Sequence, residues 1–421
     1  MTARRSIACA LGAVALAALH TTAVADSDQD RERDRSKDRT VTVDCASGDT
    51  VARALTRGDD RKSLTILVSG TCAENIVINR SDVKLAAAAP GATVVGADAT
   101  LDVIRVTGSR VTIDGIAVTG GRNGILADGA AGLIVQNGLV QGTGRTGIVY
   151  GHGASGVVDA VTVAGNARDG IAIDSASAAV VNSIVTQNTR HGIGVFNSGS
   201  GRIGLDNLNL PGGNTVSANG ANGINVNFGS GALIAMNAIT GNGTITAPGN
   251  PQNGIGVNSA SADLIGGNTI SGNTGQGVNL RASSLVVGDT SFGFSTVNTI
   301  TGNGSPAATG GIFAFLGSAI NMQNAVISGN NGFGIVLSLR SEAQIASTTI
   351  QNNVPSGTGN GDGIRLAFGS GLFAATPVGN VSGNSGFGIN CTDGESSVVN
   401  TGNLGIGTNG LGGVSLSCTG F

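Results

Sequence analysis

Four arginines recur at one position of a repeated motif. Arg122, Arg145, Arg168 and Arg190 each stand two residues before a glycine, at spacings of 23, 23 and 22 residues. If each repeat forms one turn of a solenoid, they stack in a column about 4.8 Å apart. Like charges at that spacing repel each other. The column therefore needs either nearby carboxylates or an anionic ligand, whose carboxylate or phosphate groups match the arginine fork. The sequence leaves both explanations open.

A second column contains residues that could perform acid–base chemistry. Asp128, His152 and Asp174 are 24 and 22 residues apart, which is one repeat each. The two carboxylates would then lie two turns apart, about 9 to 10 Å. That is the upper edge of the separation found between the acid and the base of inverting glycoside hydrolases. We therefore treat these three residues as candidate catalytic residues, with surface residues in turns as the alternative.

Three further side chains adjoin the two columns. Asp169 and His191 each follow one of the arginines, and Tyr150 is the only tyrosine of the chain. Together with the four arginines they are the candidate ligand-binding residues, although Tyr150 occupies an apolar repeat position. The sequence therefore predicts that any functional face lies between Arg122 and Asn197. The later repeats offer mainly Asn, Gly, Ser and Phe, which are enough to build turns and core.

Short strands must position these residues. A motif of the form x-Gly-Ile-x-Val recurs, with apolar residues one and three places after the glycine, as in a strand with one buried face. Between copies lie two more short apolar pieces, which gives about three strands per turn. We predict an all-β, right-handed, single-stranded parallel β-helix of about 14 rungs. The glycine of the motif stands at positions 124, 147, 170, 192, 223, 254, 277, 311, 334, 363, 388 and 413.

Glycine and asparagine mark the turns of this solenoid. We interpret the 71 glycines as residues of tight turns, because no collagen-like triplet exists. Asparagine recurs four places before the repeat glycine, and stacked amides can hydrogen-bond as a ladder from rung to rung. The asparagines at this spacing are 166, 188, 219, 273, 330, 384 and 409.

The chain divides into four segments. Residues 1–25, with Arg4 and Arg5 before an apolar run and Ala23-Val24-Ala25 at the end, are typical of a secretory signal peptide. Residues 26–39 form a charged linker, which we expect to be disordered. Residues 40–119 supply an N-terminal cap and irregular first rungs, with a short capping helix that begins after Asp49 or Thr50. Residues 120–421 form the regular β-helix. We expect secretion, to the extracellular space or the periplasm, and no membrane span.

Four cysteines remain after removal of the signal peptide. An even number in an exported chain favours disulfides. The two ends of the solenoid are too far apart for a bridge, which tolerates only about 7 Å between Cα atoms. The predicted pairs are therefore Cys45 with Cys72 and Cys391 with Cys418.

The repeated strands NGIGV, DGIAI and HGIGV, with the SGN turns, resemble those of the right-handed parallel β-helix repeat proteins of the pectin-lyase-like superfamily. The resemblance covers residue 40 to the end. It implies the fold but not one activity, because that superfamily includes polysaccharide lyases, hydrolases, epimerases and adhesins. Gly151-His152-Gly153 is similar to the Gly-His-Gly element of the polygalacturonase family. The rest of that family's pattern, including its Asn-Thr-Asp element, is missing.

These observations lead to one functional expectation and two alternatives. We expect a secreted protein that binds an extracellular or surface polysaccharide in a non-catalytic or structural role. The polysaccharide would be anionic if the arginine column binds it. The alternatives are a polysaccharide lyase or glycoside hydrolase acting on a polyuronate-like glycan, and a purely structural surface rod. The net charge of −3 argues against a nucleic-acid partner. We expect no cofactor, because the tight cluster of acids that calcium requires is incomplete.

Overall fold

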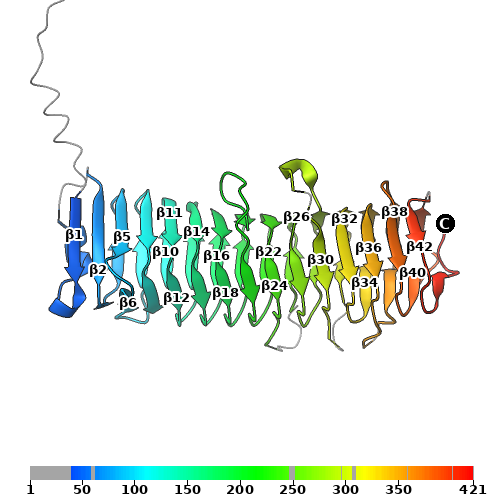
Figure 1. Cartoon of the computed structure of the whole chain (residues 1–421), viewed down its shortest axis with the longest axis horizontal. Helices are drawn as coiled ribbons and strands as arrows, with labels where there is room; N and C mark the ends of the chain where they lie inside the picture. The colour runs from blue at the N-terminus through cyan, green and yellow to red at the C-terminus, as the bar shows by residue number, and fades with distance from the viewer. Residues whose placement is uncertain are drawn as a thin grey trace, which may run out of the picture. The chain divides into compact units, whose positions relative to one another are not determined.

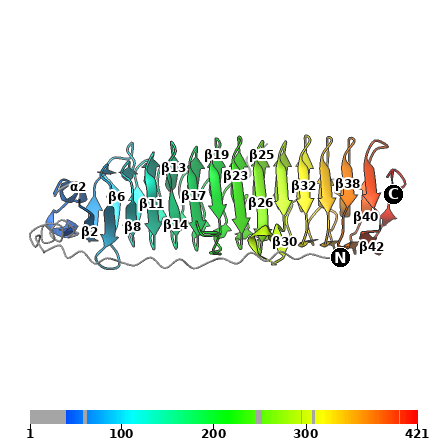
Figure 2. The same ribbon diagram turned by 90° about the horizontal axis from the view of Figure 1, so that it is seen from above.

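The computed structural model describes residues 39–57, 62–245, 252–294, 296–305, 310–357, 359–400 and 402–420. The predicted signal peptide and all but the last residue of the predicted linker lie outside these ranges. Residues Asp38–Phe421 form one compact unit. Within this unit, short strands stack rung upon rung along a single axis (Figures 1 and 2).

The first of three parallel sheets, sheet A, begins at the N-terminal end of the unit and continues to its C-terminal end. Each of its strands pairs in parallel with the strand one rung on, as β1 does with β2 and β38 with β41. The 15 strands of the described residues are β1 (Arg39–Asp44), β2 (Leu64–Ser69), β5 (Val83–Ala87), β8 (Val111–Asp114), β11 (Ala131–Gln136), β14 (Ser155–Asp159), β17 (Ser177–Val181), β20 (Ser200–Ile203), β23 (Gly231–Ala235), β26 (Ser261–Gly266), β29 (Ser284–Val287), β32 (Ala319–Met322), β35 (Glu342–Ile345), β38 (Gly371–Ala374) and β41 (Ser397–Asn400).

Sheet B follows sheet A in every rung and has mostly shorter strands. Its strands pair in the same parallel way from β3 to β42. Its 14 strands in the described part of the chain are β3 (Thr71–Ala73), β6 (Thr93–Gly96), β9 (Ala117–Gly120), β12 (Leu139–Gln141), β15 (Thr162–Ala164), β18 (Ile184–Thr186), β21 (Thr215–Ser217), β24 (Ala238–Thr240), β27 (Thr269–Ser271), β30 (Asn298–Thr301), β33 (Ala325–Ser328), β36 (Thr348–Gln351), β39 (Gly379–Ser382) and β42 (Leu404–Ile406).

Sheet C completes each rung and contains the strands of the Gly-Ile repeat. The three sheets together form a right-handed parallel β-helix of about 14 rungs, as predicted. The 14 described strands of sheet C are β4 (Ile76–Ile78), β7 (Ile104–Val106), β10 (Ile125–Asp128), β13 (Ile148–Gly151), β16 (Ile171–Asp174), β19 (Ile193–Phe196), β22 (Ile224–Asn227), β25 (Ile255–Asn258), β28 (Val278–Arg281), β31 (Ile312–Phe315), β34 (Phe333–Leu337), β37 (Asp362–Leu366), β40 (Phe387–Cys391) and β43 (Gly412–Val414).

The core is one continuous stack of aliphatic side chains inside the helix. In sheet C the isoleucine of each motif lies directly over that of the next rung; Ile125, Ile148 and Ile171, for example, pair in sequence and are fully buried. The early strands join the same stack, because Ile76 pairs with Ile104 and Ile104 with Ile125. Strand pairing in sheets A, B and C therefore continues past residue 120 without a break.

The repeat glycine has a steric role beyond the predicted one in turns. Positive φ angles explain many other glycines, such as Gly165 at +62°, but none of the twelve repeat glycines has one. A Cβ atom on Gly170 would lie 2.5 Å from Val185 Cγ1 and 2.7 Å from Asn188 Nδ2. Since real contacts are longer than this, glycine makes room for the next rung's side chains. The repeat glycines therefore allow close packing between rungs, in addition to the predicted role of glycine in turns.

The predicted asparagine ladder is confirmed. Asn188 Nδ2 donates to Asn219 Oδ1 at 3.0 Å, and Asn219 Nδ2 donates in turn to Asn242 Oδ1 at 2.9 Å. Each amide also serves the backbone, as when Asn219 Nδ2 donates to Val185 O at 3.1 Å. The stacked amides satisfy buried backbone groups that water cannot reach. The ladder includes Asn166, Asn188, Asn219, Asn242, Asn273, Asn303, Asn330, Asn353, Asn384 and Asn409.

The ends of the β-helix are closed as predicted. The helix α2 (Val51–Leu55) begins after Thr50, whose side chain accepts a hydrogen bond from Arg53 N, and its Val51 and Ala54 are buried. A 3-10 turn, η2 (Cys45–Ser47), precedes it. The disulfides join Cys45 to Cys72 and Cys391 to Cys418, with Cα separations of 5.1 and 5.0 Å. No helix in the described part of the chain is long and apolar enough to cross a membrane.

The asparagine ladder yields a stability prediction. Asn219→Ala leaves Asn188 Nδ2 and Val185 O without these partners in a buried site, which we expect to cost about 2 to 4 kcal/mol. Guanidinium denaturation followed by circular dichroism measures the loss. The control is Asn207→Ala on the exposed loop after β20, which should change stability by less than about 0.5 kcal/mol. Equal midpoints for the two variants would contradict a stabilising role of the ladder.

Candidate ligand-binding surface

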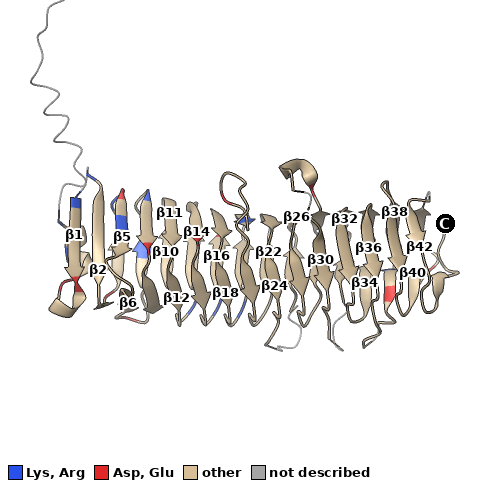
Figure 3. Ribbon diagram, viewed as in Figure 1, with Lys and Arg blue, Asp and Glu red and all other residues tan. Residues whose placement is uncertain are grey.

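The predicted arginine column is formed at the turn between sheets B and C. Arg168 N donates to Arg145 O at 2.9 Å, and Arg190 N donates to Arg168 O at 2.8 Å, so these residues stack rung on rung. Charged segments gather over the N-terminal half of the β-helix, whereas the strands beyond β28 carry few (Figure 3). The structure therefore brings Arg145, Arg168 and Arg190 together, with Arg122 at the same position of the preceding copy.

The outer two arginines of the column are paired within the chain. Arg122 Nε and Nη2 each donate to the Asp102 carboxylate at 3.1 Å. Arg190 makes the same two-bond contact with Asp169, through Nε at 2.6 Å and through Nη2. Both carboxylates are almost completely buried, so these pairs are fixed parts of the turn. Asp169 is therefore a partner of Arg190 and has no surface left for a ligand.

The inner two arginines have no such partner. In the described residues no carboxylate lies within ion-pair distance of Arg145 or Arg168. Partial burial, followed by the charge of Arg190, lowers the pKa of Arg168. Arg145 lowers it further, against the opposite effect of Asp169. The centre of the column thus carries two stacked positive charges whose repulsion the chain only partly offsets.

His191 is partly buried beside the end of the column. Its Nδ1 accepts a hydrogen bond from Asn222 N at 3.2 Å, and the backbone N–H of His191 donates to Asp169 Oδ1 at 3.2 Å. Burial lowers the pKa of His191 to about 4, and Arg190 and Arg168 lower it in the same direction, against the effect of Asp169. The imidazole is therefore neutral at physiological pH and adds no charge to the column.

Tyr150 does not belong to the surface. Its side chain has no exposed area and its hydroxyl donates within the core to Leu133 O at 3.0 Å or Val157 O at 3.1 Å. Burial raises the pKa of the phenol. Because the ring fills an inward position of β13, Tyr150 cannot touch a ligand outside the β-helix, and its inclusion among the ligand-binding residues was wrong.

Asp128 and Asp174 are two rungs apart in sheet C, as the spacing predicted, because both pair with Gly151 in register. The Asp128 carboxylate is bound by Arg105 and by His152 Nδ1, the latter at 2.6 Å. These contacts, that of His152 first, lower the pKa of Asp128. Asp128 is therefore held in its ionised form, whereas a general acid must carry a proton.

Asp174 has separate partners. Asn197 Nδ2 donates to its Oδ1 at 2.8 Å, and the hydroxyl of Ser175 does so at 3.3 Å. His152 points into solvent, with 82% of its side chain exposed. The structure brings Asp128 and His152 together, but Asp174 joins a different set of contacts. None of these contacts directs the two carboxylates toward one reacting atom.

Sequence reasoning missed a groove on the outer face of sheet C. It crosses β22, β25, β28 and β31 and has a volume of about 260 Å³. One outward row consists of Asn225, Gly256, Asn279 and Phe313, and the next consists of Asn227, Asn258, Arg281 and Phe315. His191 lies at one end of the groove, which therefore adjoins the arginine column. The available signal was polar residues at outward positions of the repeat, as in Gly-Ile-Asn225-Val-Asn227.

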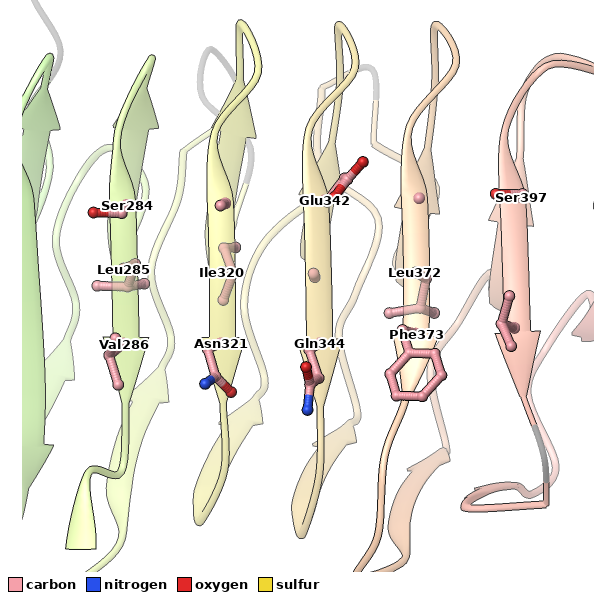
Figure 4. A pocket seen from close by; sticks show the side chains of 14 residues that line it. Ser284, Leu285, Val286, Ile320, Asn321, Glu342, Gln344, Leu372, Phe373 and Ser397 are labelled. Atoms are coloured by element: carbon pink, nitrogen blue, oxygen red, sulfur yellow. The ribbon is translucent and has the colours of Figure 1, made fainter. Parts of the chain in front are cut away.

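A second concave surface lies on the outer face of sheet A, near the C-terminal end, with a volume of about 450 Å³. Figure 4 shows Val286, Asn321, Gln344 and Phe373 at the same height on neighbouring strands, with Glu342 projecting from the row above. Phe373 is 44% exposed. The face is open and its polar side chains are solvated, so nothing on it defines a ligand.

A carboxylate pair lies on sheet A farther toward the middle. Asp263 projects from β26 and contacts Asp289, which caps the 3-10 turn η3 (Thr290–Phe292) by accepting a hydrogen bond from Ser291 N. Burial, and then the charge of Asp289, raise the pKa of Asp263 to about 7. Two adjacent carboxylates cannot both ionise readily. Asp263 therefore takes up a proton at a higher pH than an ordinary aspartate, and its contact with Asp289 joins the η3 segment to the sheet. Among the described residues no cluster of His, Cys, Asp or Glu is arranged to hold a metal.

Comparison with known proteins supports the fold. Residues 68–210 match the family model for a right-handed β-helix region, which confirms the resemblance to right-handed parallel β-helix repeat proteins. No curated protein sequence shows a significant match.

Similar solved structures include two epimerases and a pectate lyase. The A-module of a mannuronan C-5 epimerase from Azotobacter vinelandii has 14% identity and a TM-score of 0.41, with 84% of this chain and 89% of that chain covered. A pectate lyase has 14% identity and a TM-score of 0.40, covering 69% and 79%. A periplasmic alginate epimerase has 12% identity and a TM-score of 0.46, covering 89% and 83%. At these values no activity is transferred to this chain.

The burial of His191 predicts a pH dependence. In the unfolded chain histidine has a pKa of about 6.5, whereas in the folded chain the pKa of His191 is about 4. The unfolded state therefore binds a proton first as the pH falls, and the contribution of His191 to stability is lost between about pH 6.5 and 4. His191→Asn keeps an acceptor for Asn222 N but cannot titrate. Denaturation midpoints at pH 7 and 5 should differ less in this variant than in the wild type.

His152→Asn is the control for this measurement, because His152 is exposed and asparagine tolerates its left-handed φ of +52°. This variant should lose at least as much stability as the wild type between pH 7 and 5. An equal pH dependence of wild type and His191→Asn would contradict the neutral, buried state of His191.

Proposed function

We propose that this protein is exported and binds an acidic polysaccharide along the arginine column, without cleaving it. The observation that carries the proposal is the unpaired centre of the column. Arg145 and Arg168 stack one rung apart, and among the described residues neither has a carboxylate partner, although Arg122 and Arg190 have one each. The carboxylates of an acidic sugar chain would supply the partners that Arg145 and Arg168 lack.

Electrostatics supports an anionic partner. The lowered pKa of Arg168 reflects burial and the charges of Arg190 and Arg145, which means that adding negative charge nearby is favourable. Guanidinium groups bind carboxylates through two parallel hydrogen bonds. A flexible polymer can meet successive rungs about 4.8 Å apart, and weak individual contacts then add up along the column.

Export is supported by the two disulfides at the ends of the β-helix, since such bonds persist in oxidising compartments. The predicted signal peptide at residues 1–25 agrees with this proposal.

The catalytic alternative receives less support from the site. A hydrolase needs one protonated and one ionised carboxyl group that converge on the scissile bond. Asp128 is held ionised by His152 and Arg105, and Asp174 is engaged by Asn197. We therefore favour binding over cleavage by these residues.

The direct test of the proposal removes the unpaired charges. Arg145→Ala/Arg168→Ala should weaken binding of polygalacturonate or alginate about two- to thirtyfold at low ionic strength, because each exposed ion pair contributes about 0.2–1 kcal/mol. Wild-type binding should itself weaken at physiological salt, where the Debye length is about 8 Å. Isothermal titration calorimetry at both salt concentrations measures these changes.

A matched control separates position from net charge. Arg53→Ala/Arg57→Ala removes two exposed charges at the N-terminal cap and should leave binding within about twofold of wild type. If both double variants bind alike, or if the wild type binds neither polymer at low salt, the column is not a polyanion site.

The catalytic alternative has its own test. We expect the wild type not to shorten either polyuronate on prolonged incubation, and Asp128→Asn to bind as the wild type does. Size-exclusion chromatography of the polymer, with absorbance detection of unsaturated ends, measures cleavage. If polymer fragments appear with the wild type and not with Asp128→Asn, the protein is an enzyme that uses Asp128, and the proposal of binding without cleavage is wrong.

A further inference from the structure

The groove on sheet C contains two buried polar atoms with no partner in the chain. Asn225 Nδ2, a donor, and Asn227 Oδ1, an acceptor, are inaccessible to bulk solvent, and neither has a hydrogen-bond partner among the described residues. Both side chains line the groove, and Asn225 is only 5% exposed. An unpaired buried polar atom costs about 1 to 3 kcal/mol. Two of them in a single groove indicate a site that a polar ligand completes.

The neighbouring amides hold these two side chains in place. Asn222 Nδ2 donates to Asn225 Oδ1 at 2.9 Å, which fixes the orientation of the Asn225 amide and leaves its Nδ2 without a partner beside the groove. Asn222 Oδ1 accepts in turn from Asn253 N at 2.8 Å, so the amides are anchored to the next rung. Gly256 lies beneath them, because a Cβ there would come within 2.4 Å of Asn222 Nδ2. The unpaired donor is therefore pre-positioned.

Aromatic rings bound the groove at its far end. Phe313 and Phe315 stack with ring centroids 5.1 Å apart and an interplanar angle of 28°. Near the other end, Phe196 packs against His191, with centroids 6.3 Å apart, and Arg190 lies 5.5 Å over the Phe196 ring. Flat apolar rings beside amides are suited to a molecule with both an apolar face and hydroxyl groups, which is the chemistry of a sugar ring.

The charge of the groove selects among sugars. No carboxylate lines it, and its single ionisable cation is Arg281, whose Nη1 donates to Asn258 Oδ1 at 3.3 Å. The His191 imidazole is neutral. A hydroxyl group both accepts and donates, so it matches a free donor and a free acceptor on the same strand, whereas a carboxylate cannot donate to Asn227 Oδ1.

We propose that this groove is a second glycan-binding site, specific for uncharged sugar units. Asn225 donates to a hydroxyl of one unit and Asn227 accepts from a hydroxyl of the same unit. Phe313 and Phe315 lie three rungs farther along sheet C, about 14 Å away, and contact the apolar face of another unit of the same glycan. The site is separate from the pair Arg145 and Arg168 and does not depend on the proposed binding of an acidic polymer. If both sites bind, the polymer that this protein recognises contains neutral as well as acidic sugars.

The test uses neutral oligosaccharides of glucose, galactose, mannose and N-acetylglucosamine with the full mature chain. Saturation-transfer NMR and calorimetry should detect saturable binding of at least one of them. Asn225→Ala/Asn227→Ala should weaken that binding about tenfold, because it removes two hydrogen bonds. Phe315→Leu keeps the apolar bulk without the flat ring and should weaken it as well, which provides a second variant if the first is poorly folded.

Two controls accompany these variants. Asn321→Ala/Gln344→Ala removes two exposed amides from sheet A, and Arg145→Ala/Arg168→Ala removes the acidic-polymer site; both should bind the neutral sugar as the wild type does. The inference is overturned if no neutral oligosaccharide binds saturably at millimolar concentration, or if both groove variants bind like the wild type. It is also overturned if an oligouronate binds in the groove and Arg281→Ala abolishes that binding, because the site would then be acidic.

Discussion

The register of this β-helix depends on hydrogen bonds that run along its axis. Parallel strands bond rung to rung in three sheets, and buried amides do the same at the turn between sheets B and C. The spacing along the chain varies without disturbing this register: Asn166 and Asn188 are 22 residues apart and Asn188 and Asn219 are 31, yet each pair makes the same amide contact. The extra residues leave the rung as loops. Residues at the same position of successive repeats therefore stack on one another, whatever the length of the repeat.

Stacking turns a repeated residue type into a continuous surface. Isoleucine at one position gives the core, asparagine gives the ladder, and arginine gives a column of like charge. The protein neutralises the ends of that column with Asp102 and Asp169 and leaves the middle open. Beyond the column the outer face of sheet C changes from charged to amide and aromatic side chains. One side of the β-helix thus carries two neighbouring environments, one of unpaired arginines and one of amide and aromatic side chains.

The sequence was sufficient for the architecture because the apolar period and the repeat spacing are local signals. It predicted the capping helix after Thr50 and both disulfides. It missed Asn242, Asn303 and Asn353 in the ladder, because inserted residues separate them from the repeat glycine and the four-residue spacing is lost.

The sites were harder to predict, because contacts between neighbouring rungs have no fixed sequence spacing. Asp102 pairs with Arg122, 20 residues later in the chain, and no sequence motif predicts this ion pair. Tyr150 was grouped with surface residues for its chemistry, although its repeat position is inward. The groove around Asn225 and Asn227 became recognisable only once the structure showed which polar atoms lack partners.

The central claim is that Arg145 and Arg168 bind successive carboxylates of an acidic glycan. A crystal structure of the chain with a short oligouronate tests it most directly. The account predicts sugar carboxylates bonded to both guanidinium groups at about 2.8 Å, one on each rung. An oligouronate that lies elsewhere, for example on the sheet A face around Phe373, with both arginines unchanged, would contradict the account.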